Sequence, residues 1–255
     1  MDDFIFRGRS IKDFGAVAAF GASMKTGAKI KRSEYELPGG GSVLIGEAAY
    51  QPTQRAVTIT PADGVEATPR WRRALLGWLQ SGRGEMIVLN DPDVLRLAQF
   101  DSDGTFGTQG WPLGELKLTL TLQPLAYNVL ETSASQETSA GVARVPVTVD
   151  SAMRMPLRVI LAATSGTITT ATIAAGGEAL ELADLRLAAG QRLCYDAGQY
   201  LGDAASLSID DEITFAPVAN GRWARLTALP QDVARVQVTG GEARVTVIAR
   251  GRWPA

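Results

Sequence analysis

Between Thr68 and Asn128, hydrophobic and polar residues follow two patterns in turn. The first, directly after Thr68, has the spacing of a helix, and the second, from Leu116 to Gln123, alternates strictly as in a strand. Thr68 can accept a hydrogen bond as an N-cap, and Pro69 suits the first helical position, where a missing N–H costs nothing. We therefore predict a helix that begins at Pro69 and stops before Gly82 and Gly84. Five apolar residues are expected on one face, with Arg72, Arg73 and Gln80 pointing elsewhere: Trp71, Ala74, Leu75, Trp78 and Leu79.

Strand patterns dominate the rest of the first half. Glu85 to Leu89 is typical of a short buried strand, and from Leu116 to Gln123 leucines alternate with polar residues, which predicts one buried and one wet face. Phe4 to Phe6 also reads as a strand. The runs Lys29 to Leu37 and Val43 to Thr60 flank the glycine tip 38–41, so the segment Ala28 to Tyr50 predicts a long projecting hairpin.

A polar stretch from Glu131 to Gly141 has no large apolar residue and predicts a linker between domain 1–130 and domain 142–255. Short alternating runs then recur with Gly, Asp and Pro turns, which favours a two-sheet sandwich or jelly roll. The only possible helix there is Leu182 to Leu187. The runs are Val145 to Val149, Leu157 to Leu161, Ile168 to Ile173, Leu180 and Leu182, Ile213 and Phe215, Trp223 to Leu229, Val236 and Val238, and Val245 and Val247.

Composition limits the binding partners and the cellular compartment that we expect for the protein. The 255 residues carry a formal charge of −2, which gives no long-range attraction to nucleic acid or to an anionic membrane. Lys25, Lys29, Lys31 and Arg32 form a local basic cluster that we interpret as a solvated hairpin face. The single cysteine excludes an intrachain disulfide, the acidic start lacks the plan of a secretion signal, and no apolar run could span a membrane. Synthesis in a reducing cytoplasm is expected.

Residues that commonly carry catalysis are scarce. The chain has no histidine, which removes the commonest general base and the commonest zinc ligand. Without an imidazole partner, Cys194 is interpreted as a buried inert thiol in a strand. We therefore expect no catalytic residue, no cofactor, no metal site and no enzymatic activity.

Three further motifs have a functional and a structural interpretation. Asp101 to Gly104 imitates the start of a calcium loop, but Phe106 and Pro112 stand where that loop needs glycine and glutamate. With Asp91 and Asp93 these aspartates suit turns, although a calcium site or a glycosidase pair stays open. The glycine run 39–41 lacks the lysine of a phosphate loop. Trp71 and Trp78 favour core packing over a sugar or base platform.

The N-terminal half resembles the distal tail protein family of long-tailed (siphovirus-type) bacteriophages. The resemblance rests on motifs in order: the entry Phe4 to Gly8 with Ser10 to Gly15, the arm motif Leu37 to Ser42 continuing to Tyr50 and to Arg55–Ile59, the helix Pro69 to Leu79, and the strands Met86–Asn90 and Leu116–Tyr127. More loosely, Leu226–Pro230, Val236–Thr239, Ala243–Ala249 and Arg250–Trp253 resemble the galectin-like or carbohydrate-module-like sandwich of many members.

The resemblance implies a mainly β protein: an N-terminal β-sandwich-like ring domain with one α-helix and a β-hairpin arm, plus a C-terminal galectin-like or jelly-roll β-sandwich. It implies a homo-hexameric ring at the tail tip of the virion that joins the tail tube protein to the baseplate, tail-tip hub, fibre or tape-measure proteins. A closed ring needs a heterologous interface, for which the arm is the candidate. Its anchor candidates are Leu37, Val43, Leu44, Ile45 and Tyr50.

Two other hypotheses stay open. The C-terminal sandwich could recognise a host-surface glycan, with Trp223 and Trp253 as the aromatic residues to test. A glycoside hydrolase with an Asp/Glu pair is the third, although no carboxylate pair stands out from turn chemistry.

Overall fold

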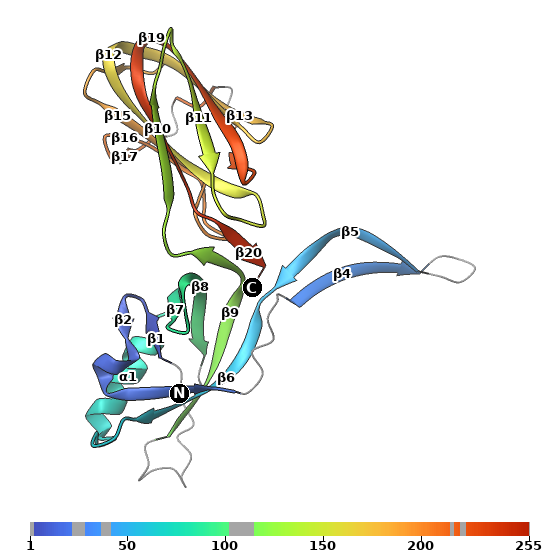
Figure 1. The fold of residues 1–255 in the computed structure, drawn as a ribbon, viewed down its shortest axis with the longest axis vertical. Helices are drawn as coiled ribbons and strands as arrows, with labels where there is room; N and C mark the ends of the chain where they lie inside the picture. Colours follow the sequence, from blue (N-terminus) through green and yellow to red (C-terminus); the bar gives the residue numbers. More distant parts are fainter. Residues whose placement is uncertain are drawn as a thin grey trace. The chain divides into compact units, whose positions relative to one another are not determined.

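The computed structural model describes residues 3–21, 29–36, 42–101, 115–214, 217–219 and 223–254 (Figure 1). The chain divides into two compact units, residues 1–129 and residues 130–253, with the last two residues counted with the first unit. Both units consist mainly of antiparallel strands, and α1 (Pro69–Leu79) is the one α-helix within the described ranges. The predicted mainly β class is confirmed.

The first unit is built on a twisted antiparallel sheet whose strands follow the order β2-β1-β7-β8-β9-β6-β3. A short 3-10 helix, η1 (Ile11–Phe14), links β2 to β3. The strands are β1 (Phe4–Phe6), β2 (Arg9–Ser10), β3 (Ala16–Phe20), β6 (Thr53–Pro61), β7 (Gly84–Val88), β8 (Asp91–Asp101) and β9 (Leu116–Asn128). As predicted, Leu116, Leu118, Leu120 and Leu122 are all buried on one face of β9.

Helix α1 begins and packs largely as predicted. The Thr68 hydroxyl accepts from the Trp71 backbone N–H at 3.2 Å, and Leu75, Trp78 and Leu79 are buried against the sheet. Two positions differ from the prediction: Ala74 is exposed, and Arg72 is only 6% exposed. Arg72 lies three and seven residues before Leu75 and Leu79, which places it on the buried stripe of the helix.

Aromatic rings fill the space between α1 and the sheet. The Trp78 ring stacks on Phe14 with centroids 4.6 Å apart and on Phe4 at 5.8 Å, while Phe6 meets Phe100 edge to face at 5.1 Å. Both indole N–H groups donate to backbone oxygens: Trp78 to Phe6 at 3.1 Å and Trp71 to Phe14 at 2.6 Å. The structural interpretation of the two tryptophans is therefore correct.

A separate two-stranded sheet consists of β4 (Lys29–Glu36) and β5 (Ser42–Gln51) (Figure 1). The pairing runs from Lys29 opposite Gln51 to Glu36 opposite Ser42, with an irregularity between Lys31 and Ser33. The predicted hairpin is thus present in the backbone. Its glycine tip, residues 38–41, lies outside the described residues.

The second unit is a β-sandwich with a single buried core. Its main path is β10-β19-β12-β15-β16-β17, and further strands join β12 and β19. The strands are β10 (Thr132–Glu137), β11 (Val142–Thr148), β12 (Met155–Ala175), β13 (Glu178–Leu182), β14 (Leu187–Ala188), β15 (Arg192–Asp196), β16 (Ser206–Ile209), β17 (Glu212–Ile213), β18 (Thr227–Ala228) and β19 (Gln231–Ala249). The short β20 (Arg252–Pro254) follows β19 in the chain and is not a strand of this sheet.

Two long strands pass through both layers of this sandwich (Figure 1). The first part of β12 pairs with β15 and with the end of β19, whereas its last part pairs with β13 and with the first part of β19. The paired register of β12 and β19 shifts twice, between Ala163 and Ser165 and between Gly166 and Thr170. The sequence predicted two separate strands here, one before and one after residues 164–167, because the run Thr-Ser-Gly-Thr at those positions resembles a turn.

Glycine is required where β12 and β19 bend together. Gly166 and Gly240 have φ values of +68° and +86°, and a Cβ on Gly240 would lie 2.4 Å from the Thr167 carbonyl oxygen. A Cβ on Gly166 would lie 2.5 Å from the Gly240 oxygen. Only residues without a side chain allow the two backbones to approach this closely, so the bend depends on these positions.

Three local predictions for the second half are wrong. The predicted linker contains β10, which pairs with β19 from Thr132 opposite Ala249 to Glu137 opposite Arg244. A polar strand can occupy this position because five of its six residues are exposed and only Ala134 packs on the core. Residues 183–186 form no helix, since the chain there links β13 to β14. The predicted strand Trp223 to Leu229 is reduced to β18.

Candidate interaction sites

The hairpin of β4 and β5 brings the predicted arm residues onto one strand. Val43, Leu44 and Ile45 pair through β5 with Tyr35, Glu34 and Ser33, and Tyr50 pairs with Ile30. Tyr50 is half-buried, and Leu37 lies outside the described residues.

The hairpin also offers strand edges. Within the described part of the chain, β4 and β5 are paired with each other and not with the larger sheet of the first unit. An unpaired edge presents a row of backbone N–H and C=O groups that can receive a strand from another chain. The use of these edges in an interface stays a prediction.

The two tryptophans proposed for glycan contact are placed differently from each other. Trp223 is half-buried, packs against the sandwich core, and its ring lies 5.9 Å from the Tyr195 ring at 51°. Trp253 is half-buried in β20. Since Trp223 contributes to packing, the surface it can offer to a sugar is reduced.

Tyr195 fixes the chain that follows Trp223. Its buried hydroxyl donates to the Ala224 oxygen at 2.6 Å and accepts from the Leu226 N–H at 2.9 Å. Burial raises the pKa of this phenol, and the Leu226 N–H partly opposes that shift. The neutral phenol is thus a structural connector in the core of the second unit.

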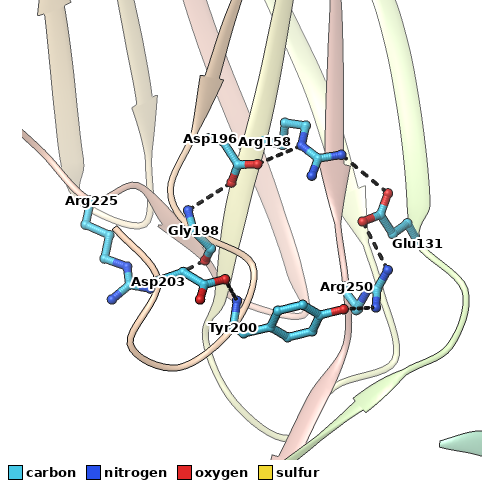
Figure 2. A network of polar contacts seen from close by, with 8 residues as sticks. All are labelled: Glu131, Arg158, Asp196, Gly198, Tyr200, Asp203, Arg225 and Arg250. Atoms are coloured by element: carbon cyan, nitrogen blue, oxygen red, sulfur yellow. Dashed lines mark hydrogen bonds and ion pairs between the residues drawn. The ribbon is translucent and has the colours of Figure 1, made fainter. Parts of the chain in front are cut away.

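A polar network lies on one face of the second unit (Figure 2). Arg158 donates through Nε to Asp196 at 2.9 Å, and its Nη1 lies 3.7 Å from the Glu131 carboxylate. Glu131 also pairs with Arg250 at 3.2 Å, and Arg250 donates to the Tyr200 hydroxyl at 2.8 Å. Burial lowers the pKa of Arg158, but Asp196 and Glu131 outweigh that effect and raise it overall.

The same network holds the loop that joins β15 to β16. Asp196 accepts from the Gly198 N–H at 2.8 Å, and Asp203 accepts from the Tyr200 N–H at 3.0 Å (Figure 2). Arg225 donates to the Ala197 and Gly198 oxygens at 2.9 Å and 3.4 Å. The loop is therefore fixed at both ends and at its centre.

Beside this loop lies an open hollow of about 500 Å³. Its lining includes the side chains of Arg158, Asp196, Gln199, Tyr200, Asp203 and Ser206. Sequence reasoning missed this site entirely. Nothing in the sequence shows that Glu131, Arg158 and Arg250, which are far apart along the chain, meet beside this loop.

The described residues show no catalytic centre. Cys194 is half-buried in β15, and burial raises its thiol pKa while Arg158 partly opposes that shift. Asp101 accepts hydrogen bonds from Gln99 at 3.0 Å and from Thr121 at 2.6 Å, whereas residues 102–114 lie outside the described part. Among the described residues, no group of three or more His, Cys, Asp or Glu side chains could hold a metal ion.

Comparison with solved structures assigns this architecture to a class, the fold of phage tail hub proteins. The chain matches the crystal structure of SPP1 Dit (gp 19.1), described as a paradigm of the hub adsorption apparatus in phages that infect Gram-positive bacteria. The TM-score is 0.66 at 13% identity, covering 99% of both chains. The resemblance to distal tail proteins is thus confirmed at the level of the fold.

Two further matches come from the activated baseplate of phage p2. The structure with Ca gives a TM-score of 0.52 at 9% identity over 98% of this chain and 97% of that one. The structure with Sr gives 0.56 at 9% identity over 100% and 99%. No protein-family model and no curated protein matches the sequence.

Proposed function

We propose that this protein is a structural component of a phage tail tip, part of the hub that links the tail to the host-adsorption apparatus. The observation that carries the proposal is the fold shared over the whole chain with a hub protein. The absence of histidine and the lack of a metal-ligand cluster among the described residues agree with a role in assembly rather than in catalysis.

In this proposal six copies form a closed ring, and the hairpin of β4 and β5 clasps the neighbouring subunit. Its strand edges supply backbone hydrogen bonds, and the apolar residues Val43, Leu44, Ile45 and Tyr50 supply burial. A projecting element that meets a different surface on the next copy is the heterologous contact that ring closure needs. The tail tube protein and the tail-tip hub, fibre or tape-measure proteins would contact the ring in the virion.

Mass photometry and negative-stain imaging of the purified full chain test the ring. We expect a hexamer with a central opening. A variant in which a short glycine-serine turn replaces residues 30–49 should remain monomeric, because it lacks the proposed clasp. It should still fold, because the described core of the first unit contains no hairpin residue. A wild-type protein that stays monomeric at high concentration would contradict the ring, and a variant that still forms hexamers would contradict the clasp.

A role in host-glycan binding through Trp223 and Trp253 is an alternative without support, since Trp223 is used in packing.

Within the described ranges, no helix is long and apolar enough to cross a membrane.

A further inference from the structure

Two arginines face each other on the exposed surface of β11 and β19. Arg144 lies directly opposite Arg235, and both residues are exposed. The Arg144 backbone N–H donates to the Gln136 side chain at 3.2 Å and therefore points away from β19, and a cross-strand pair of this kind brings its side chains closest. In the described part of the chain, neither guanidinium pairs with an acceptor. Like charges directly opposite each other destabilise a sheet, and nothing described in the unit compensates for them.

An apolar pair lies beside the two arginines on the same face. Pro146 is opposite Val233, and each is two residues along its strand from one of the arginines, a spacing that places side chains on one face. Pro146 is exposed, and Val233 is 50% exposed. We call the surface of these four residues the basic face. Positive charge next to exposed apolar area fits a partner that combines carboxylates with an apolar side chain.

The turn between β16 and β17 carries that combination. Three consecutive carboxylates are exposed there, those of Asp210, Asp211 and Glu212, and the next residue, Ile213, is 71% exposed. Among the described residues, no donor or cation pairs with the Glu212 carboxylate. We call residues 210–213 the acidic turn. Its negative charge and its exposed isoleucine complement the basic face.

The acidic turn is ordered before any contact is made. Asp210 and Asp211 have φ values of +46° and +71°, which suit a hairpin turn of type I′. Asp210 accepts from the Arg192 N–H at 2.9 Å and from the Gln191 amide at 2.8 Å, and these donors lower its pKa, so the carboxylate is ionised at neutral pH. Asp211 pairs with the Arg192 side chain, which leaves two carboxylates, those of Asp210 and Glu212, for the two arginines. A turn ordered in advance loses little conformational entropy on docking.

The basic face and the acidic turn lie on different sides of the second unit. In Figure 1, β17 is at one side of this unit and β11 is toward the other. β11 pairs with the first part of β19, whereas β17 ends the path that runs through β12, β15 and β16. One copy therefore cannot join its own two surfaces, but it can offer one to each of two neighbours. That is a heterologous contact, the kind that repeats around a ring.

We propose that the acidic turn of one copy docks on the basic face of the next copy. The carboxylates of the turn pair with the two arginines, and Ile213 covers the apolar pair. A turn of four residues buries far less than the roughly 1,200 Å² of a stable interface, so the contact forms only where something else holds the copies together. The inference rests on the proposed ring, which would supply that proximity and raise the effective concentration of each turn near its neighbour.

Double-cysteine cross-linking of the full chain tests the contact. In Ile213→Cys/Val233→Cys, mild oxidation should join copies into a ladder of covalent oligomers up to the hexamer on a non-reducing gel, because a disulfide requires Cα atoms within about 7 Å. The matched control is Ile213→Cys/Glu181→Cys, since Glu181 is exposed on β13, two strands from β19, and should give no ladder. Cys194 is present in every variant, so any cross-link of its own appears in all of them.

Charge reversal in the same double-cysteine chain tests recognition. Glu212→Arg should lower the ladder yield about 5-fold, since an exposed ion pair is lost and a repulsion is created. Arg144→Glu with Arg235→Glu should lower it likewise, and all three changes together should restore it. Arg186→Glu reverses an exposed arginine between β13 and β14 and should leave the yield unchanged. Arg235→Glu alone should raise the denaturation midpoint of the second unit, because it removes the like-charge pair.

Mass photometry of each variant separates this contact from the ring. Hexamers without a ladder, or a ladder that charge reversal leaves unchanged, overturn the contact while the ring stands. Monomeric wild-type protein overturns the ring and the contact with it. Hexamers may also give no ladder yet bind a polyglutamate peptide that the Arg144→Glu/Arg235→Glu chain does not bind. The basic face would then serve an acidic segment of another protein, and the contact between copies is again overturned.

Discussion

The cores of the two units are built from different side chains. In the first unit, Phe4, Phe6, Trp78 and Phe100 pack between one helix and a sheet. In the second, Tyr195 is the one aromatic residue among the buried core residues of the described chain, and the rest are aliphatic, with one methionine. A helix on a sheet leaves an irregular gap that large rings fill, whereas two facing strand layers are filled by Val, Leu, Ile and Ala. Each unit should therefore be sensitive to a different kind of substitution.

The largest effect is expected for Trp78→Ala in the first unit. The variant removes a buried ring that contacts Phe4, Phe6 and Phe14 and leaves the Phe6 oxygen without its indole donor. We expect a loss of about 3–5 kcal/mol in the free energy of unfolding. Hydrogen-exchange mass spectrometry, read separately for peptides of each unit, measures it.

Trp71→Ala is the matched control, since this half-buried residue on the same helix also donates its indole N–H to a backbone oxygen. It should cost clearly less. Equal loss of protection for both variants, or loss of protection in the second unit, would contradict the assignment of Trp78 to the centre of the first core.

For the second unit, Gly240→Ala tests the bend rather than the side-chain packing. The new Cβ would meet the Thr167 oxygen at 2.4 Å in a backbone with φ of +86°. Steric conflict and strain together should cost about 3 kcal/mol, measured by chemical denaturation. Gly177→Ala separates the two causes, because Gly177 has φ of +90° with no atom within 4 Å of the added Cβ. If both variants lose the same stability, close backbone approach is not what the bend requires.

Tyr195→Phe should have a smaller effect in the same unit. It keeps the ring but removes the hydroxyl that joins the Ala224 oxygen to the Leu226 N–H. Two backbone groups then lose a buried partner, and a loss of about 2 kcal/mol in the free energy of unfolding is expected. Thermal unfolding of the variant beside wild type checks it. A variant as stable as wild type would show that water replaces the hydroxyl.

The smallest effect concerns Cys194. Burial raises the pKa of its thiol above the ordinary value of 9.0. A thiol with a raised pKa keeps its proton in the folded state. Its contribution to stability is therefore complete below the unfolded pKa and is lost as pH rises above that value. Alkylation rates against pH should show a higher midpoint in the folded protein than in protein unfolded with urea. Coincident midpoints would contradict the burial of this thiol.

Local patterns predicted the first unit better than the second. The N-cap at Thr68, the proline after it and the leucine alternation from Leu116 act within a few residues, so α1 and β9 were predictable. The continuity of β12 through Gly166 was not, because the turn-like residues there serve a bend whose partner, Gly240, lies 74 positions later. The pairing of β10 was likewise hidden, since a mostly exposed edge strand needs no apolar alternation.

The candidate sites divide in the same way. The hairpin could be predicted from two alternating runs around a glycine tip, because its pairing is local. The Tyr200 hollow could not, since its polar network joins Glu131, Arg158, Asp196 and Arg250 from four separate segments. Arg72 shows the limit of residue type as a guide, because helical geometry placed a charged side chain on the buried stripe of α1.

The passage of β12 and β19 through both layers has a mechanical consequence. Because these strands continue from one layer into the other, the two layers are joined by peptide bonds as well as by side-chain packing. A pulling force applied to either layer would travel along the backbone into the other. The second unit should therefore resist shearing of its two layers against each other.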